Sequence, residues 1–376
     1  MKNMKNENKK RLAKLGAVLL IFTWLGLAIS GILLPDKDIS VAERRPLKKL
    51  PNISVSTLLD GSFMRDFEGY VLDQFPLRDQ FRTLKSTFHY YGLSQKDNNG
   101  IYMDKGYAAK MDYTLKPTSI SYAAGKFQYI YDTYLRDSSG NIVFATIPDK
   151  SLYMAQNGGH LNIDYKELYT LIASKTPWAK HLDLSDALSL DDFYKTDSHW
   201  RQEKIFPAAN AIADALKVKG PAEKDFAKET LNQPFYGVYY GQGALPMKGE
   251  KITLMKNHLL ENCRVYDYES GKYREIYSME KAAGKDMYEV YLGGARALLT
   301  MEMDACPENL GKELIVFRDS FGSSIVPLLA GSYEKITLVD IRYISSNMLG
   351  QIMDFHGQDV LFLYSSGLLN GSSVLK

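Results

Sequence analysis

Apolar residues along the chain fall into three patterns, and each predicts a different kind of element. The first is an unbroken apolar run over residues 15–34, LGAVLLIFTWLGLAISGILL, which contains no charged residue. A helix of this length rises about 30 Å, enough to cross the hydrocarbon core of a bilayer. The run therefore predicts a transmembrane helix.

The second pattern is amphipathic. After a charged segment over residues 35–54, which we interpret as a stalk, apolar residues recur at helical spacing between 55 and 91. The pattern is interrupted near Pro76, because proline does not continue a helix. The apolar residues are Leu58, Leu59, Phe63, Phe67, Val71, Phe75, Phe81 and Leu84.

The third pattern alternates helical segments with short β-branched runs, the order that a parallel sheet with helical crossovers requires. It predicts that residues 55–376 form one α/β domain built on a mostly parallel sheet. An extended piece is expected over 100–111 and helices over 118–135, 165–173 and 206–216. Strands are expected over 141–147, 180–184, 313–317, 335–339 and 360–364.

Between about residues 218 and 310, tyrosine-rich segments punctuated by glycine replace this alternation. One of them is FYGVYYGQG over residues 235–243. Aromatic residues favour strands and glycines favour turns, so antiparallel strands and turns are expected here. We interpret the stretch as a β-rich insertion in the α/β domain.

Charge predicts the orientation of the apolar run. Residues 1–14 contain six bases, whereas the other flank, from Pro35 to Asp38, contains one. Basic flanks stay in the cytoplasm, so residues 1–14 are predicted to be cytoplasmic and the chain after Pro35 to lie outside the cytoplasm. The alternative is a cleaved signal peptide, because Ala28 and Ser30 are small residues spaced as in a cleavage site; the length of the run favours an uncleaved anchor.

The length and net charge of the chain exclude one class of function. The chain has 376 residues and a net charge of +2, and without the N-terminal bases it is mildly acidic. This argues against a nucleic-acid partner, which would need basic residues concentrated on the folded part.

Cys263 and Cys306 have no metal-binding spacing, so a structural disulfide or two buried thiols stay open. The histidines show no ligand-like spacing and no phosphate loop follows a strand, so no metal or cofactor is predicted.

A candidate nucleophile lies where the strand over 313–317 ends. In the segment LIVFRDSFGSS a buried strand stops at Arg318 and a helix starts a few residues later, which places Ser320 in the turn between them. Open α/β sheets bind ligands at the carboxyl ends of their strands, and amides at a helix N-terminus can stabilise an oxyanion. The alternative is that Asp319, Ser320 or Ser323 only caps the helix.

The segment TDSHW over residues 196–200 contains a carboxylate and an imidazole two positions apart, in what is expected to be a loop. A hydroxyl nucleophile needs a neutral imidazole to take its proton, and the imidazole needs a carboxylate to hold its tautomer and stabilise the cation that forms. Asp197 and His199 could supply both groups from one loop. The alternative is a surface loop whose histidine only packs or caps.

These segments resemble a known group of proteins. TDSHW is similar to the TD-x-HW signature of the DHHW family and of the AlgJ and AlgX alginate-acetylation proteins, and RDSFGSS over 318–324 is similar to their later serine block. Ser198 departs from the pattern, which has a second histidine there. The resemblance covers nearly the whole chain and includes the N-terminal anchor, ERRPL over 43–47, FE over 67–68, DQFPLR over 73–78 and IPDK over 147–150.

The resemblance implies the SGNH hydrolase superfamily, and with it a three-layer α/β/α sandwich. It also implies the roles of three residues: Ser320 as nucleophile, His199 as base and Asp197 as the carboxylate that orients the base. The oxyanion hole would use the Ser320 amide, and further oxyanion or substrate candidates are Gly241, Gln242, Gly243, Lys150 and Trp200. Surface charge is the plainer interpretation of Lys150, and packing that of Trp200.

The function that the resemblance implies is an extracytoplasmic O-acetyltransferase. It would move an acetyl group through an acyl-serine onto a cell-envelope polysaccharide, with a polytopic membrane O-acyltransferase of the MBOAT type as acetyl donor. The alternatives are a carbohydrate acetylesterase with the same triad and a non-catalytic glycan-binding protein of the envelope.

Overall fold

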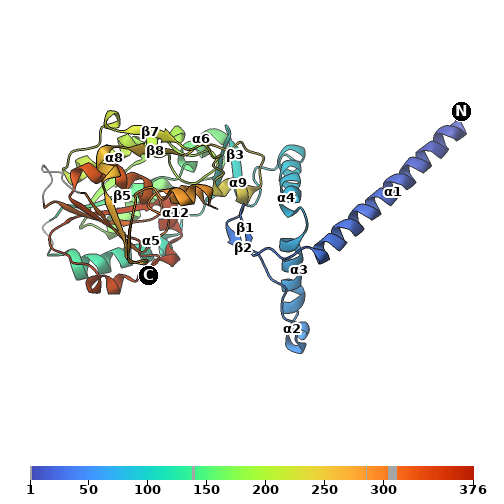
Figure 1. The fold of residues 1–376 in the computed structure, drawn as a ribbon, viewed down its shortest axis with the longest axis horizontal. Coiled ribbons are helices and arrows are strands. Elements are labelled where there is room, and N and C mark those ends of the chain that lie inside the picture. Colours follow the sequence, from blue (N-terminus) through green and yellow to red (C-terminus); the bar gives the residue numbers. More distant parts are fainter. Residues whose placement is uncertain (1, 138–139, 285, 304–310) are drawn as a thin grey trace. The chain divides into compact units, whose positions relative to one another are not determined.

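The computed structural model describes residues 2–137, 140–284, 286–303 and 311–376, and the chain divides into two compact units. The first unit comprises residues 1–95 with 244–246, and the second comprises 96–243 with 247–376. Figure 1 labels several elements of each unit. Residues 55–95 group with the N-terminal helix in this division, whereas the sequence placed them in the α/β domain.

The first unit is mainly helical. Its first helix is α1 (Lys2–Leu33), and the part Lys9–Leu33 is long and apolar enough to cross a membrane. Pro76 lies between two later helices, as the sequence predicts. The other elements are β1 (Ile39–Ser40), β2 (Arg45–Pro46), α2 (Val55–Leu59), α3 (Ser62–Gln74), α4 (Arg78–Thr87) and the π-helical turn η1 (Phe88–Gly92).

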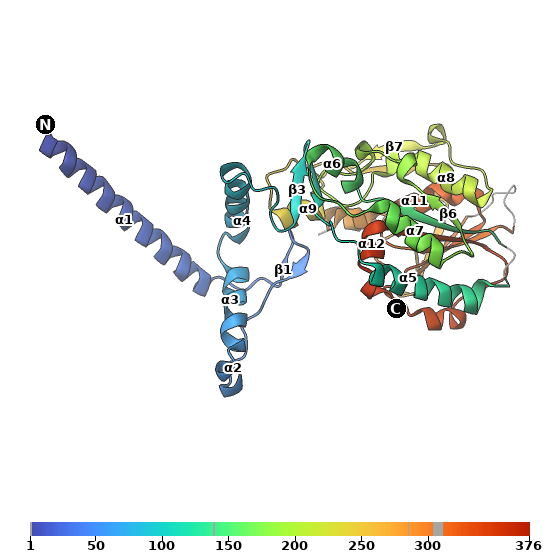
Figure 2. The same ribbon diagram turned by 180° about the vertical axis from the view of Figure 1, so that it is seen from behind.

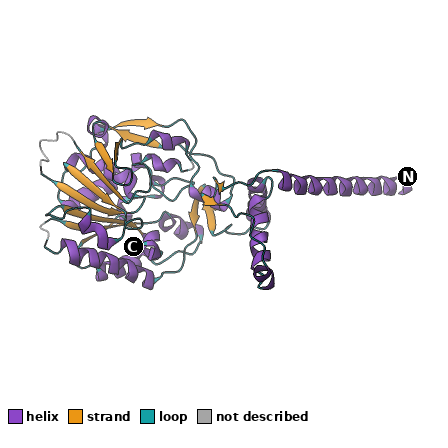
Figure 3. Ribbon diagram, turned by 60° about the horizontal axis from the view of Figure 1, so that its bottom comes forward, coloured by secondary structure: helices purple, strands orange, loops and turns teal. Residues whose placement is uncertain are grey.

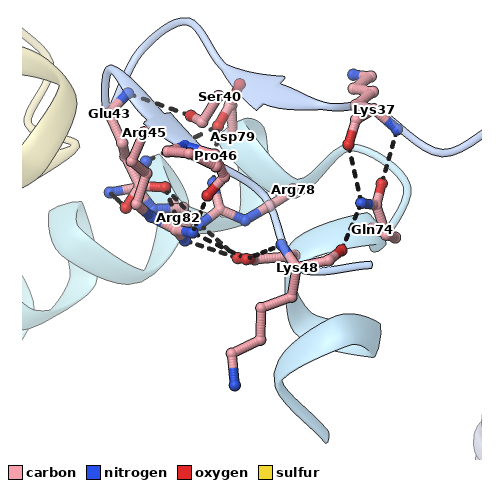
Figure 4. A network of polar contacts seen from close by, with 11 residues as sticks. Lys37, Ser40, Glu43, Arg45, Pro46, Lys48, Gln74, Arg78, Asp79 and Arg82 are labelled. Atoms are coloured by element: carbon pink, nitrogen blue, oxygen red, sulfur yellow. Dashed lines mark hydrogen bonds and ion pairs between the residues drawn. The ribbon is translucent and has the colours of Figure 1, made fainter. Parts of the chain in front are cut away.

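Charged side chains connect α3 and α4 to the segment that contains β1 and β2 (Figure 4). The Asp73 carboxylate accepts hydrogen bonds of 2.8 and 2.6 Å from Arg45, and these bonds lower the pKa of Asp73 to about 2. Glu43 pairs with Arg78 at 2.6 Å and with Arg82 at 3.1 Å. The polar sides of both helices are thus the sides held inside this unit.

The second unit is built on an eight-stranded sheet of order β10-β9-β11-β13-β12-β14-β5-β6. The five strands from β13 to β6 run parallel, whereas β11, β9 and β10 add an antiparallel edge. This mostly parallel sheet confirms the predicted α/β class. The strands are β5 (Ile142–Ile147), β6 (Lys180–Asp183), β9 (Arg264–Asp267), β10 (Lys272–Arg274), β11 (Leu298–Glu302), β12 (Glu313–Arg318), β13 (Lys335–Val339) and β14 (Asp359–Ser365).

Helices cover both faces of this sheet, which Figure 3 shows in orange between purple helices. Successive strand residues point to opposite faces: in β14, Phe362 packs with the residues of α5 (Pro117–Ile130) and α7 (Tyr165–Lys175), and Leu363 with those of α8 (Phe206–Leu216). Figure 2 shows all three helices from behind. The other helices of this unit are α6 (Ser151–Gly158), α9 (Val238–Gly243), α10 (His258–Glu261), α11 (Gly322–Ile325) and α12 (Ser366–Asn370).

The tyrosine-rich insertion agrees with its prediction only in part. It does contain antiparallel strands, and β7 (Ala227–Thr230) pairs with β8 (Thr253–Lys256) as β3 (Ile101–Asp104) pairs with β4 (Tyr107–Lys110) earlier in the chain. The FYGVYYGQG segment, expected as strand and turn, contains the helix α9 instead. Its first amides bond to the loop around residues 196–197, so tertiary contacts override the strand preference of its aromatic residues.

Candidate active site

Ser320 lies in the turn that follows β12. β12 is an inner strand of the sheet, and β14 and β5 lie between it and the edge strand β6. The preceding residue ties this turn to the neighbouring strand: the Asp319 carboxylate accepts hydrogen bonds from the Phe321 amide at 3.1 Å and from the Ser365 amide, at the end of β14, at 2.9 Å. Both carboxylate oxygens are used, and Asp319 is buried. The position of Ser320 is therefore set by two adjacent parallel strands.

Asp197 and His199 lie in a short loop that an isolated bridge between Phe193 and Trp200 closes. The Tyr194 amide donates to the His199 carbonyl at 3.0 Å. Asp197 is fully buried, and its Oδ1 atom accepts from the His199 amide at 3.0 Å. The same loop thus fixes the backbone of the histidine and the carboxylate beside it.

The structure brings the three predicted residues into one hydrogen-bonded line. His199 Nδ1 is 2.6 Å from Asp197 Oδ1, and His199 Nε2 is 2.7 Å from Ser320 Oγ. The second carboxylate oxygen of Asp197 accepts from the Val238 amide at 2.8 Å. In this arrangement the imidazole can accept the hydroxyl proton on one nitrogen while the carboxylate holds the proton on the other.

Two aromatic residues hold the imidazole and the serine turn together. The ring of Tyr288 stacks on His199 with centroids 3.9 Å apart and planes 12° apart, and its hydroxyl is 2.7 Å from Ser324 Oγ. Trp200 is fully buried, and its indole N–H donates to Ser324 Oγ at 2.8 Å and to the Phe321 carbonyl at 3.2 Å. These contacts fit the packing interpretation of Trp200, and they link the histidine loop to the helix that follows Ser320.

Lys150 is fully buried at the end of β5, so it is not a surface charge. Its Nζ atom donates to three backbone carbonyls of the histidine loop: those of Tyr194 at 2.7 Å, Lys195 at 3.2 Å and Asp197 at 2.6 Å. The ammonium also lies 5.1 Å from the centroid of the Tyr239 ring. Burial lowers the pKa of Lys150 to about 8. Through these contacts Lys150 supports the loop that contains His199.

The three candidates Gly241, Gln242 and Gly243 form the second half of α9. The carbonyl of Gly243 accepts from Asn98 at 2.8 Å, and that of Gln242 from Asn99 at 3.0 Å. The start of α9 supports the Asp197 carboxylate, as the Val238 amide shows. The role of these three residues in an oxyanion hole stays a prediction.

With this geometry in place, the chain can be compared with known proteins. No protein-family model and no curated protein matches it. A DHHW family protein from Eubacterium siraeum superposes with a TM-score of 0.60 at 20% identity, over 74% of this chain and 94% of that one. PatB1 of Bacillus cereus, in a structure with a sulfonyl adduct, superposes with a TM-score of 0.58 at 20% identity, over 72% and 95%. The O-acetyltransferase domain of Pseudomonas putida AlgJ gives a TM-score of 0.44 at 13% identity, over 72% and 92%.

The chain shares its fold with the first two of these proteins. They include a member of the DHHW family, the group that the TDSHW and RDSFGSS segments resemble. The structural likeness therefore agrees with the resemblance found in the sequence.

Two residues that support the site cannot be recognised from the sequence. Tyr288 comes from the short helix η8 (Met287–Val290), far along the chain from the histidine that it covers. Glu250 accepts from the amide and the hydroxyl of Thr196, at 2.9 and 3.0 Å, and so holds the start of the TDSHW segment. Neither tyrosine nor glutamate is unusual in its own segment, and only the fold brings them to the site.

Two further expectations concern metals and thiols. In residues 2–137, 140–284, 286–303 and 311–376, no group of three or more His, Cys, Asp or Glu side chains could hold a metal ion. Cys263 is buried, with its Sγ atom 3.8 Å from Met303 Sδ. Cys306 lies outside the described residues, so the alternatives of a disulfide and two buried thiols both stay open.

Proposed function

We propose that the protein is an extracytoplasmic O-acetyltransferase that carries an acetyl group on Ser320 and passes it to a hydroxyl of a cell-envelope polysaccharide. The observation that carries this proposal is the hydrogen-bonded line from Ser320 Oγ through His199 to Asp197, with separations of 2.7 and 2.6 Å. A buried carboxylate, an imidazole and a half-exposed hydroxyl in this order are the parts of an activated serine.

The reaction has two halves. In the first, Ser320 Oγ bonds to the acetyl carbon of the donor, His199 Nε2 takes the hydroxyl proton, and the bond from the acetyl carbon to the leaving group breaks as that group receives the proton. In the second, the acceptor hydroxyl gives its proton to His199, its oxygen bonds to the acetyl carbon, and Ser320 regains a proton as it leaves. Asp197 stabilises the imidazolium in both halves.

Two further features support the proposal. Sulfonyl compounds modify activated nucleophiles, and PatB1, which shares this fold, has been captured with a sulfonyl adduct. The helix Lys9–Leu33, with bases in its first turns and in the segment before it, suits a single-pass anchor whose following chain lies outside the cytoplasm. A polytopic membrane O-acyltransferase of the MBOAT type would then deliver the acetyl group across the bilayer.

The test supplies 4-nitrophenyl acetate to the full-length protein in detergent, with and without an oligosaccharide acceptor, and follows protein and sugar by mass spectrometry. We expect an acetyl-enzyme adduct, and acetylated sugar when the acceptor is present. Ser320→Ala should abolish both, and phenylmethylsulfonyl fluoride should modify the wild type but not this variant. Ser198→Ala is the matched control, because Ser198 lies in the same loop outside the hydrogen-bonded line, and it should keep wild-type activity.

The same experiment separates the alternatives. Release of acetate with no acetylated sugar would identify a carbohydrate acetylesterase with the same triad, in which water replaces the acceptor. A folded Ser320→Ala variant that reacts at the wild-type rate would overturn the enzymatic proposal and leave the glycan-binding alternative. Asp197→Asn should keep the fold and lose about four orders of magnitude in kcat, because the imidazole would be held in the wrong tautomer.

A further inference from the structure

The helix α4 and the turn η1 carry a continuous apolar stripe that faces outward. Four of its members are spaced three, four and three residues apart, which places them on one side of a helix, and the fifth, Leu77, directly precedes α4. Their exposed fractions lie between 41 and 64%. We call this set the α4 stripe: Leu77, Phe81, Leu84, Phe88 and Tyr91.

The opposite side of α4 is the side that is packed. Arg78 and Arg82 extend from it to Glu43, at 2.6 and 3.1 Å, in the network of Figure 4. Ser86 is fully buried and donates to the Ala244 carbonyl. A helix of a water-soluble unit buries its apolar side and exposes its polar side, and α4 does the reverse.

The preceding helix has the same inverted arrangement. On α3, Met64, Phe67 and Val71 are spaced three and four residues apart and are 62, 37 and 42% exposed. The Asp73 side chain of the same helix is buried against Arg45. Exposed apolar residues on two consecutive helices mark a surface that binds a protein or a membrane.

The nearest apolar environment is the membrane that the first helix of the same unit is suited to cross. The corner between α3 and α4 contacts the later part of α1: the rings of Phe75 and Trp24 are 6.5 Å apart, and a Cβ atom placed on Gly31 would lie 3.6 Å from Pro76 Cδ. On α4, Arg78 and Arg82 are paired with Glu43, whereas Lys85 is exposed and could meet an anionic headgroup.

We propose that α3 and α4 form an interfacial membrane-binding surface, with the α4 stripe inserted among the lipids at the boundary between headgroups and acyl chains. Amphipathic helices of this kind insert by about 5–10 Å. The partner is a lipid surface, not a second copy of the chain and not the second unit. The surface would hold α3 and α4 against the bilayer that contains the anchor, independently of any acyl transfer.

The test uses the full-length chain with Cys263→Ala and Cys306→Ser, reconstituted in nanodiscs with and without anionic lipid. A nitroxide label is attached at Leu84→Cys, and, as the matched control, at Asp79→Cys, whose native side chain is 58% exposed on the other side of α4. Electron paramagnetic resonance then measures how accessible each label is to oxygen, which concentrates in lipid, and to a water-soluble nickel chelate.

We expect the label at position 84 to be several-fold more accessible to oxygen than to nickel, and the label at 79 to show the reverse. Equal nickel access at both positions would overturn the proposal, because the stripe would face water. A label at 84 that neither reagent reaches, or one broadened by a nearby second label, would also overturn it in favour of a covering protein surface. The readout involves no acyl transfer, so its failure is distinct from a failure of the proposed function, and circular dichroism checks the fold of each variant.

Discussion

At the scale of single residues, Lys150 shows how a buried charge can serve a site without touching the reacting atoms. Its ammonium is fully buried, and three backbone carbonyls replace the water that it loses. All three belong to residues 194–197, directly before His199. A displacement of this loop would move the imidazole away from Ser320, so we regard Lys150 as a positioning residue.

Lys150→Met should therefore reduce kcat more than it changes KM. The variant keeps the bulk of the side chain but leaves the three carbonyls without their donor, and misplacement of a catalytic group by about 1 Å can cost roughly a hundredfold in rate. The measurement is steady-state acetyl transfer with a varied donor. Lys195→Met is the matched control: Lys195 lies in the same loop, its Nζ is 5.4 Å from the centroid of the Tyr107 ring, and its side chain is exposed. Wild-type kcat in a folded Lys150→Met variant would refute the positioning role.

The depressed pKa of Lys150 also predicts how stability changes with pH. The pKa is about 8 in the folded protein and 10.5 for an ordinary lysine. Between these values the folded state binds fewer protons than the unfolded state, so this group makes the free energy of unfolding rise with pH; below pH 8 both states are protonated and the full burial cost applies. The melting temperature of the wild type minus that of Lys150→Met should grow between a pH below 8 and a pH near 10.5. A constant difference would show that the pKa is not depressed.

The sequence identifies some residues of the site and misses others for a physical reason. Ser320 follows an apolar strand directly, and Asp197 and His199 lie two positions apart, so both placements depend on local order along the chain. The roles of Lys150 and Tyr288 depend on contacts with distant residues. Nothing local distinguishes a buried lysine at a strand end from a solvated one.

At the scale of elements, the approach of α9 to the histidine loop depends on a missing side chain. A Cβ atom on Gly237 would lie 2.3 Å from Asp197 Cβ and 2.4 Å from both Asp197 Cα and the Thr196 carbonyl oxygen. Two of these neighbours are backbone atoms and the third, Asp197 Cβ, is bonded directly to the backbone, so none of them can turn away. Glycine at this position lets the Val238 amide reach the Asp197 carboxylate.

Gly237→Ala should therefore cost both stability and activity. The added methyl would push α9 from the loop, and overpacking of this kind costs about 1–3 kcal/mol. Gly125→Ala is the control, because Gly125 lies in α5 with no atom within 4 Å of the added Cβ, and alanine in a helix is favoured over glycine by about 0.5–1 kcal/mol. Urea denaturation and acetyl transfer measure the two effects. Equal stability of the two variants would mean that the contact at Gly237 relaxes without cost.

Elements whose local sequence pattern matches their structure are the ones that the sequence predicts. The strand over 360–364 and the helix over 206–216 follow from apolar patterns of the right length, and the structure contains β14 and α8 there. The segment 235–243 has the composition of a strand, yet it contains a helix because Thr196 and Asp197 accept its amide hydrogens. Local preference fails where side chains of another loop supply the hydrogen-bond partners.

At the scale of the whole molecule, the N-terminal helix and the α/β unit make a prediction about topology. A phosphatase reporter that is active only outside the cytoplasm should be active when fused after Lys376 and inactive when fused after Lys14, because bases keep the short N-terminal flank inside. The protein should also stay in the membrane fraction after alkaline extraction. Activity after Lys14 alone would reverse the orientation, and a soluble fusion of reduced length would indicate a cleaved signal peptide.

The strand order of the second unit bears on how the protein is made. β14 lies between β12 and β5, yet the ribosome synthesises it after every other strand of the sheet. Until β14 arrives, β12 and β5 both have unpaired edges, which are prone to pair with other chains. Asp319 also lacks the Ser365 amide that helps to hold the serine turn. A chain stalled before β14 is made therefore exposes two unpaired strand edges and lacks one of the hydrogen bonds that hold Asp319, so aggregation should compete with folding at this last step.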